Sequence, residues 1–269
     1  MTERPSTLRA LLDLRAPRRR VRFGLHRQQR AELHMPAGEG PHPVAVVIHG
    51  GFWRARRSRR YMRPLCALLA RHGWAAWNVD YRRVGRGEGG GWPATFADVA
   101  AGIDALSTAD GSLDLARVVT VGHSAGGHLA LWAACRPGLP PDSPGADPSI
   151  RMSGVAAIAA VSNLEAVPSL YEPGGAVLDL MGKPPAAAPD DRYALANPAK
   201  RLPLGVPILL LHGVIDETVP VARSRNFAAE ATAAGDDVTL VESPDAGHRS
   251  VVDPRRGELD HLLEWLRAR

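Results

Sequence analysis

The fold of this chain is decided by the stretch Val118-Val119-Thr120-Val121-Gly122-His123-Ser124-Ala125-Gly126. Its first four residues are apolar in pattern and predict a strand, and the run from Gly127 to Ala134 that follows predicts a helix. Between the two stands G-x-S-x-G, which in this context places a serine on a sharp turn with its hydroxyl exposed at the end of a sheet. Glycines flank the serine because a side chain there would clash with the neighbouring strand and helix. The stretch therefore predicts a nucleophile at Ser124.

The composition is that of a folded domain. With 269 residues, of which 45% are hydrophobic, the chain can form one large α/β domain or two small ones around a sizeable core. The formal charge is +5, and arginines gather in residues 15–30 and 54–63. No aromatic-interleaved basic motif or nucleic-acid module accompanies them, so we expect solvated basic surfaces and no nucleic-acid partner.

The N-terminal sequence carries neither an export signal nor a membrane span. Residues 1–20 predict a polar arm, and the polar residues 21–30 that follow Arg18-Arg19-Arg20 lack the apolar segment of a twin-arginine signal. No apolar run approaches the length of a transmembrane helix. Cys66 and Cys135 lie in apolar helical patterns and predict buried free thiols, which are compatible with a reducing compartment. We therefore expect a soluble, cytoplasmic protein without a membrane partner.

Apolar runs and helical patterns alternate along the chain. The expected strands are Val21–Phe23, Ala31–Met35, Val44–Ile48, Trp74–Val79, Val118–Val121, Val155–Val161, Ile208–Leu211 and Val238–Glu242. The expected helices are Ser58–Arg71, Pro93 to about Leu106, Gly127–Ala134 and Glu258–Arg267. Nearly continuous apolar strands that alternate with helices predict an α/β fold, with a mostly parallel central sheet covered by helices on both faces.

One segment departs from this alternation. Residues from about 163 to 204 contain seven prolines, so long regular elements are not expected there. We interpret the segment as a small proline-rich cap within a single domain that spans residues 21–269, and a plain surface loop is the alternative. The candidates for apolar walls of a pocket under this cap are Leu170, Tyr171, Val177, Leu178 and Leu180.

A serine nucleophile needs a base, and the base needs an orienting carboxylate. In this architecture the chain order is serine, acid, histidine, with the acid after a late strand and the histidine after the last one. Asp216 follows Ile208–Leu211 in the run H-G-x-x-D-x-x-V-P, with Glu217 as its neighbouring competitor, and His248 follows the last strand. The sequence therefore predicts the triad Ser124, Asp216 and His248.

The other histidines fit the role of base less well. His123 and His128 flank the nucleophile but come too early in the chain order, so we expect them to pack around the turn. His261 lies inside the last helix, where we expect it to be exposed.

Acyl transfer also needs preorganised N–H donors for the developing oxyanion. One donor is expected from the residue after the nucleophile, Ala125, and the other from the loop after the third strand. That loop is His49-Gly50-Gly51-Phe52-Trp53, whose two glycines free the backbone to turn its amides inward. The predicted oxyanion hole consists of Gly51, Phe52 and Ala125.

These motifs together resemble the α/β-hydrolase superfamily over roughly residues 21–269. H-G-G-F-W at 49–53 and G-H-S-A-G-G-H-L at 122–129 are similar to the esterase/lipase group that contains bacterial carboxylesterases, feruloyl-esterase-like proteins and kynurenine formamidases. The resemblance implies an acyl-enzyme on Ser124, with no metal or organic cofactor. It also implies that Trp53 lines an apolar acyl or aryl pocket and that Tyr81 approaches the site, and a packing role is the equal alternative for Tyr81.

Two enzymatic hypotheses follow. The first is a carboxylic ester hydrolase for small or medium esters, and the alternative is an arylformamidase acting on N-formyl aromatic amines. For a formamide substrate with a charged amino-acid tail, the arginines of residues 54–63 are candidate partners of its carboxylate, although a solvated face is the preferred interpretation of this segment. A serine peptidase, an acyltransferase or a non-catalytic binding module on the same fold is expected less. The sequence defines neither the natural substrate nor the oligomeric state.

Overall fold

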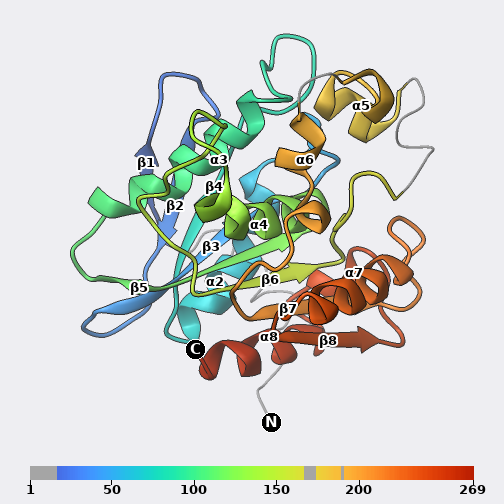
Figure 1. The fold of residues 1–269 in the computed structure, drawn as a ribbon. Helices are drawn as coiled ribbons and strands as arrows, with labels where there is room; N and C mark the ends of the chain where they lie inside the picture. The colour runs from blue at the N-terminus through green and yellow to red at the C-terminus, as the bar shows by residue number, and fades with distance from the viewer. Residues whose placement is uncertain (1–16, 167–173, 189–190) are drawn as a thin grey trace.

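The computed structural model describes residues 17–166, 174–188 and 191–269. Its centre is an eight-stranded sheet with the order β1-β2-β4-β3-β5-β6-β7-β8 (Figure 1). The strands are β1 Arg19–Arg22, β2 Arg30–His34, β3 His42–Ile48, β4 Ala75–Val79, β5 Leu113–His123, β6 Gly154–Ile158, β7 Ile208–Gly213 and β8 Val238–Ser243. Strand β2 pairs antiparallel with β1 and β4, and every other pair is parallel. The mostly parallel sheet predicted from the sequence is confirmed.

Helices cover both faces of this sheet (Figure 1). Helices α2 Arg63–Arg71 and α8 Glu258–Arg267 share one buried cluster with the side chains of Ala45 and Val47. The other face carries α3 Ala94–Asp104, α4 Ala125–Cys135 and α7 Ala222–Ala233, which pack on the cluster that contains Val44, Val46 and Ile48. Alternate residues of β3 thus enter opposite cores, as expected for a strand buried on both faces.

The sequence missed two parts of this architecture. Strand β5 begins at Leu113, five residues before the expected start at Val118. The segment 113–117 pairs with the start of β3, but its polar residues gave no apolar strand pattern, so the sequence did not predict this part of the strand. Helix α7 was not predicted, since its buried residues form only the narrow stripe Ser224, Phe227 and Ala231. Strand β1 also begins at Arg19, within the predicted N-terminal arm, whose residues 1–16 lie outside the described ranges.

The proline-rich segment forms short elements where it is described. They are α5 Ala176–Met181, η5 Pro185–Ala187, α6 Arg192–Ala196 and η6 Pro198–Lys200. The Arg54 guanidinium holds Asp179 of α5, with Nε 2.8 Å from the carboxylate, and the Trp92 amide donates to the Leu180 carbonyl. Val177 and Leu180 are buried in the core, so neither lines a pocket wall, and the candidates Leu170 and Tyr171 lie outside the described residues.

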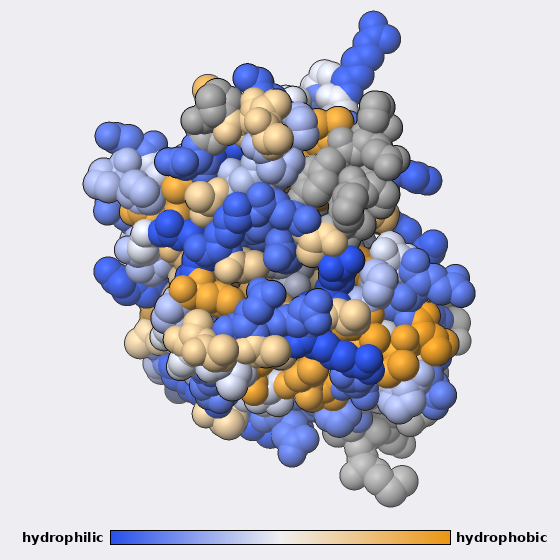
Figure 2. Space-filling view, turned by 45° about the vertical axis from the view of Figure 1, so that its right-hand side comes forward, coloured by the Kyte–Doolittle hydropathy of each residue, from blue (hydrophilic) through white to orange (hydrophobic). Residues whose placement is uncertain are grey.

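The carboxyl ends of the parallel strands meet at one edge of the sheet. Figure 2 turns this side of the molecule toward the viewer and shows a mostly hydrophilic face with separate hydrophobic patches. Phe52, Val214 and Ile215 are exposed large hydrophobic residues, and they belong to the loops that follow β3 and β7 at this edge. In the described ranges, none of the helices has the length and apolar character needed to cross a membrane.

Candidate active site

Ser124 stands on a strained turn between β5 and α4. Its φ of 58° and ψ of −121° lie in a region that few non-glycine residues adopt, and its amide donates to the Ile158 carbonyl at 2.8 Å. A Cβ on Gly122 would run into the carbonyl oxygen of Gly126, and a Cβ on Gly126 into that of Ile48. The glycines of the motif are therefore required because backbone lies against backbone, and the turn lifts the serine to the edge of the sheet.

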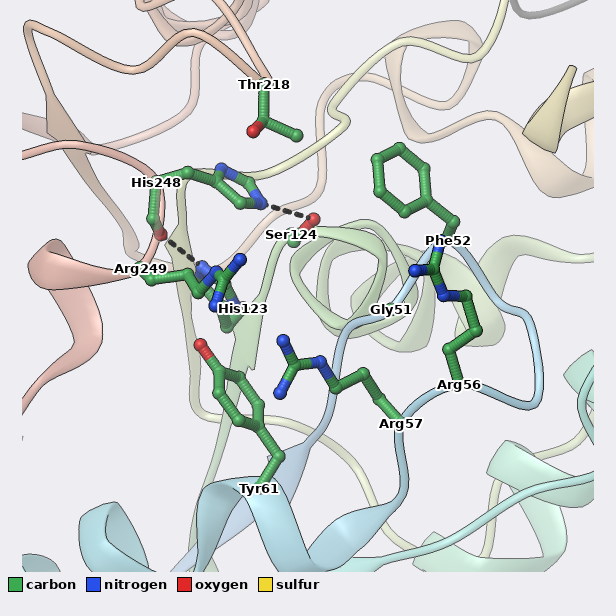
Figure 3. Close-up of a pocket in the computed structure, with 10 residues that line it drawn as sticks. All are labelled: Gly51, Phe52, Arg56, Arg57, Tyr61, His123, Ser124, Thr218, His248 and Arg249. Carbon is green, nitrogen blue, oxygen red and sulfur yellow. Dashed lines mark hydrogen bonds between the residues drawn. The ribbon is translucent and has the colours of Figure 1, made fainter.

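The three predicted residues meet at this edge, and Figure 3 shows the contact between two of them, Ser124 and His248. The Nε2 atom of His248 lies 3.0 Å from Ser124 Oγ, and its Nδ1 atom lies 2.7 Å from Asp216 Oδ2. Since Nδ1 faces a carboxylate, it carries the ring hydrogen, which leaves Nε2 to accept from the serine hydroxyl. Asp216 is buried in the turn after β7, whereas its competitor Glu217 is exposed. The order of hydrogen bonds is the one that activates a serine hydroxyl.

Asp216 is held as a carboxylate. Its Oδ1 atom accepts from the amides of Thr218 and Val219, both at 2.8 Å. Burial opposes its ionisation, but hydrogen bonds from His212, His248 and Val219 outweigh burial and hold the pKa of Asp216 well below its usual range. Asp216 therefore keeps its negative charge beside His248.

A second buried histidine, His212, contacts the Asp216 carboxylate. Its Nε2 atom lies 2.8 Å from the Val219 carbonyl and 3.3 Å from Asp216 Oδ2, and its Nδ1 atom lies 2.7 Å from Ser224 Oγ. Both groups at Nε2 are acceptors, so Nε2 carries the hydrogen and Ser224 donates to Nδ1. The H-G-x-x-D run of the sequence thus places a second histidine behind the acid.

His123 has a role that the sequence did not reveal. The sequence suggested packing, and the ring is buried, but its Nε2 atom also donates to the main-chain carbonyl of His248 at 2.7 Å. Burial lowers the pKa of His123 to about 3, so the ring is neutral at physiological pH. His123 therefore fixes the backbone of His248, and its position next to the serine in G-x-S-x-G was the only sequence signal of this contact.

The loop after β3 presents free amides beside the serine. Gly51, Phe52 and Trp53 all have positive φ angles, of 119°, 58° and 56°. The amides of Gly51 and Phe52 donate to no residue that the structure describes. The Ala125 amide opens helix α4, where N–H groups lack helical acceptors. A Cβ on Gly50 would lie 2.5 Å from the His123 carbonyl oxygen, so only glycine lets this loop approach the serine turn.

A buried network holds the loop from behind. The Tyr81 hydroxyl donates to the His49 carbonyl at 2.8 Å, and the two rings stack with centroids 4.4 Å apart. His49 Nε2 lies 3.1 Å from Asp80, whose other oxygen accepts from Arg59 at 2.7 Å. Burial opposes the ionisation of Asp80, but the hydrogen bond from His49 and nearby positive charges lower its pKa to about 2. Asp80 therefore remains a carboxylate between His49 and Arg59.

The prediction for Trp53 needs correction, and for Tyr81 the burial agrees with the packing alternative. Both side chains are buried, with exposed fractions of 1% and 0%, and neither lines the pocket. Trp53 packs edge-on against His128, because the left-handed turn at residues 51–53 directs Phe52 outward and Trp53 into the core. Neither side chain is part of the cavity lining, and Tyr81 instead contacts the loop of residues 49–53, which is named the oxyanion loop after its expected role.

The expectation of a solvated arginine face at residues 54–63 is also wrong in part. Arg59 and Arg63 are 7% and 9% exposed and pair with the buried Glu32. Burial opposes the ionisation of Glu32, and its arginine partners still lower its pKa to about 2. Only part of the arginine-rich segment therefore faces solvent.

A cavity of about 330 Å³ opens in front of Ser124 (Figure 3). Phe52 and Thr218 form one part of its lining, and Tyr61 with the arginines 56, 57 and 249 forms another. In the part of the chain that the structure describes, no cluster of His, Cys, Asp or Glu side chains is placed to hold a metal ion. The groups at the cavity can supply a nucleophile, a base and oxyanion donors.

The sequence matches the BD-FAE family model over residues 32–230. The chain belongs to the BD-FAE family. Among curated relatives of this family member, the probable carboxylic ester hydrolase LipM of Mycobacterium tuberculosis is 30% identical over 196 residues, which are 70% of this chain and 44% of LipM. Esterase LipQ of the same organism is 29% identical over 220 residues, which are 77% of this chain and 50% of LipQ. The chain thus spans about half the length of these relatives.

Solved structures share the fold of this BD-FAE family member. A truncated carbohydrate esterase from gut microbiota superposes with a TM-score of 0.79 at 20% identity. The match covers 92% of this chain and 94% of the carbohydrate esterase. Esterase 2 of Thermogutta terrifontis, solved with butyrate bound, gives a TM-score of 0.69 at 26% identity. The match covers 89% of this chain and 87% of the esterase. The α/β-hydrolase fold expected from the sequence motifs is confirmed.

Proposed function

We propose that the chain is a serine hydrolase that cleaves carboxylic esters of small or medium size through an acyl-enzyme on Ser124. The observation that carries the proposal is the continuous hydrogen-bond chain from Asp216 through His248 to Ser124. The relatives LipM and LipQ, named as an ester hydrolase and an esterase, support it. The butyrate-bound esterase of Thermogutta terrifontis supports a short acyl group, since the cavity here is of modest volume, about 330 Å³.

The proposed mechanism uses each group in turn. His248 Nε2 takes the hydroxyl proton as Ser124 Oγ attacks the ester carbonyl, and the Asp216 carboxylate stabilises the imidazolium. The amides of Gly51, Phe52 and Ala125 stabilise the oxyanion of the tetrahedral intermediate. His248 then protonates the departing alcohol, and the same residue activates the water that releases the acid.

The first test is the variant Ser124→Ala. We expect the variant to keep the fold and its kcat for 4-nitrophenyl butyrate to fall at least about 10³-fold. Without the nucleophile, only substrate binding and the oxyanion hole still accelerate the reaction. Circular dichroism checks the fold, and Ser107→Ala, which changes an exposed serine, retains full activity. An active Ser124→Ala enzyme contradicts the assignment of the nucleophile.

A second measurement separates ester from formamide hydrolysis. We expect kcat/KM for 4-nitrophenyl butyrate to exceed that for N-formylkynurenine. A formamide rate about 100-fold above the ester rate, equivalent to about 2.7 kcal/mol of preferential transition-state binding, would instead identify an arylformamidase.

A further inference from the structure

The cavity at Ser124 is strongly basic. Arg56, Arg57 and Arg249 line it, and no aspartate or glutamate is found among its described lining residues. No ion pair joins any of these three guanidinium groups to a carboxylate within the described ranges. Neighbouring arginines differ, since Arg54 is paired with Asp179 and Arg255 with Asp253. Unpaired cations therefore gather at the substrate-binding side of the nucleophile.

Arg57 lies against the oxyanion loop itself. A Cβ built on Gly51 would lie 2.6 Å from Arg57 Cβ, so the stem of this arginine occupies the space that glycine leaves open. Arg83 donates to the main-chain carbonyl of Arg57, and the Arg57 guanidinium lies 4.9 Å from the ring centroid of Tyr61. The side chain is thus held half-buried beside the reacting atoms rather than extended into solvent.

Tyr61 lies where two of the guanidinium groups converge. Arg57 lies over the Tyr61 ring, and Arg249 lines the same cavity. Burial raises the pKa of Tyr61, whereas the positive charges of Arg57 and Arg249 act in the opposite direction. Figure 3 shows the side chains of Arg57 and Arg249 extending into the pocket from opposite sides. The Tyr61 hydroxyl is buried without a hydrogen-bond partner among the described residues. Asp253 also acts on this hydroxyl, but Arg255 holds its carboxylate at 2.6 Å.

We propose that the pocket selects esters that carry a carboxylate close to the scissile bond, with Arg57 and Arg249 as the anion-binding groups. The inference rests on the proposed ester hydrolase function and specifies its substrate class. A guanidinium presents several N–H donors in a plane that matches a carboxylate, and such charge-assisted bonds are stronger than neutral ones. A substrate anion also reduces the electrostatic repulsion among Arg56, Arg57 and Arg249, which form no ion pair with a carboxylate of the described residues.

Two pairs of substrates test the proposal and show which side of the ester carries the charge. The acyl pair is the 4-nitrophenyl monoester of adipic acid and its methyl-capped diester. The alcohol pair is 4-acetoxybenzoate and its methyl ester. We expect kcat/KM for the anion to exceed that for its neutral partner at least tenfold in one pair. The ratio falls when NaCl rises from 20 to 500 mM, because salt screens charges near solvent.

Variants link this ratio to the named arginines. In Arg57→Gln/Arg249→Gln the ratio of anionic to neutral kcat/KM drops at least tenfold. Arg60→Gln leaves the ratio unchanged, because Arg60 is exposed on the same segment, outside this pocket, and the substitution removes the same type of charge. Circular dichroism confirms that each variant is folded.

The outcomes separate the two proposals. Equal hydrolysis of the charged and neutral partners in both pairs overturns the anion preference and leaves the esterase proposal intact. A ratio that the double variant does not change overturns the assignment to Arg57 and Arg249. If no ester is cleaved, the proposed function fails. Calorimetric titration with adipate and 4-hydroxybenzoate then decides the anion site, and absence of binding overturns it as well.

Discussion

At the scale of single residues, Tyr81 shows how a buried side chain acts on the site. Its hydroxyl is the only side-chain donor that the described residues offer to the His49 carbonyl, at the point where β3 turns into the oxyanion loop. The ring stacks on His49, so loss of the hydroxyl alone keeps the packing. Tyr81 is therefore a positioning residue whose effect is separable from its contribution to the core.

We expect Tyr81→Phe to lower kcat about tenfold with little change in KM, because the loop amides act more on the transition state than on the bound ester. Steady-state kinetics with 4-nitrophenyl butyrate checks this. Tyr193→Phe is the matched control, since it removes a tyrosine hydroxyl that donates to the Lys183 carbonyl away from Ser124. A Tyr81→Phe enzyme with a raised KM and an unchanged kcat would contradict the positioning role.

The sequence predicted the proximity of Ser124, Asp216 and His248 because each follows a recognisable strand, and parallel strands end at the same edge. It did not predict the inward direction of Trp53 or the bond from His123 to the His248 backbone. Both depend on backbone torsions and on contacts between segments far apart in the chain, which residue spacing does not encode.

At the scale of elements, the packing of β5, α4 and β3 depends on glycines at the points of closest approach. Helix α4 begins directly after Ser124, and its second residue, Gly126, lies against the last residue of β3. The helix is buried along its entire length, so it cannot shift to accommodate a side chain.

Gly126→Ala is therefore expected to destabilise the protein by at least about 2 kcal/mol, because overpacking here pushes backbone against backbone. A thermal melt shows this as a drop in Tm of several degrees. Gly111→Ala is the control, since an added Cβ there meets no atom within 4 Å and the Tm stays close to that of the parent. Equal melting temperatures for the two variants would show that β5 and α4 adapt more freely than the structure indicates.

The predictability of the elements followed their apolar content. Strands β6 and β7 are buried throughout, β3 is buried except at Pro43, and all three were found from continuous apolar runs. Helix α7 and the start of β5 were missed because their sequences are largely polar and their placement comes from neighbours in the sheet.

At the scale of the whole molecule, buried histidines make stability depend on pH. Burial lowers the pKa of His34 and of His128 to about 4, and that of His123 to about 3. In the unfolded chain these rings titrate near the ordinary value of about 6.5. Between these values the unfolded state binds more protons, so the free energy of unfolding falls as the pH falls below about 6.5.

As the pH falls, the free energy of unfolding is expected to decrease by about 1.4 kcal/mol per pH unit for each histidine that stays neutral in the folded state. Urea unfolding at intervals from pH 7.5 to 4.5 measures the slope. His34→Leu reduces it by about one histidine's contribution, because both ring nitrogens of His34 are buried without a partner in the described residues. A slope that His34→Leu leaves unchanged would show that His34 is protonated in the folded protein.

The separation of the reacting groups along the chain has a consequence for protein synthesis. In the proposed mechanism the nucleophile and the base are 124 residues apart, and the acid lies between them in the chain, in the turn after β7. A chain growing on the ribosome contains Ser124 long before His248 has been made, so the serine has no base and stays chemically inert. Covalent labelling of Ser124 by a fluorescent phosphonate therefore reports the moment at which the last strand joins the sheet.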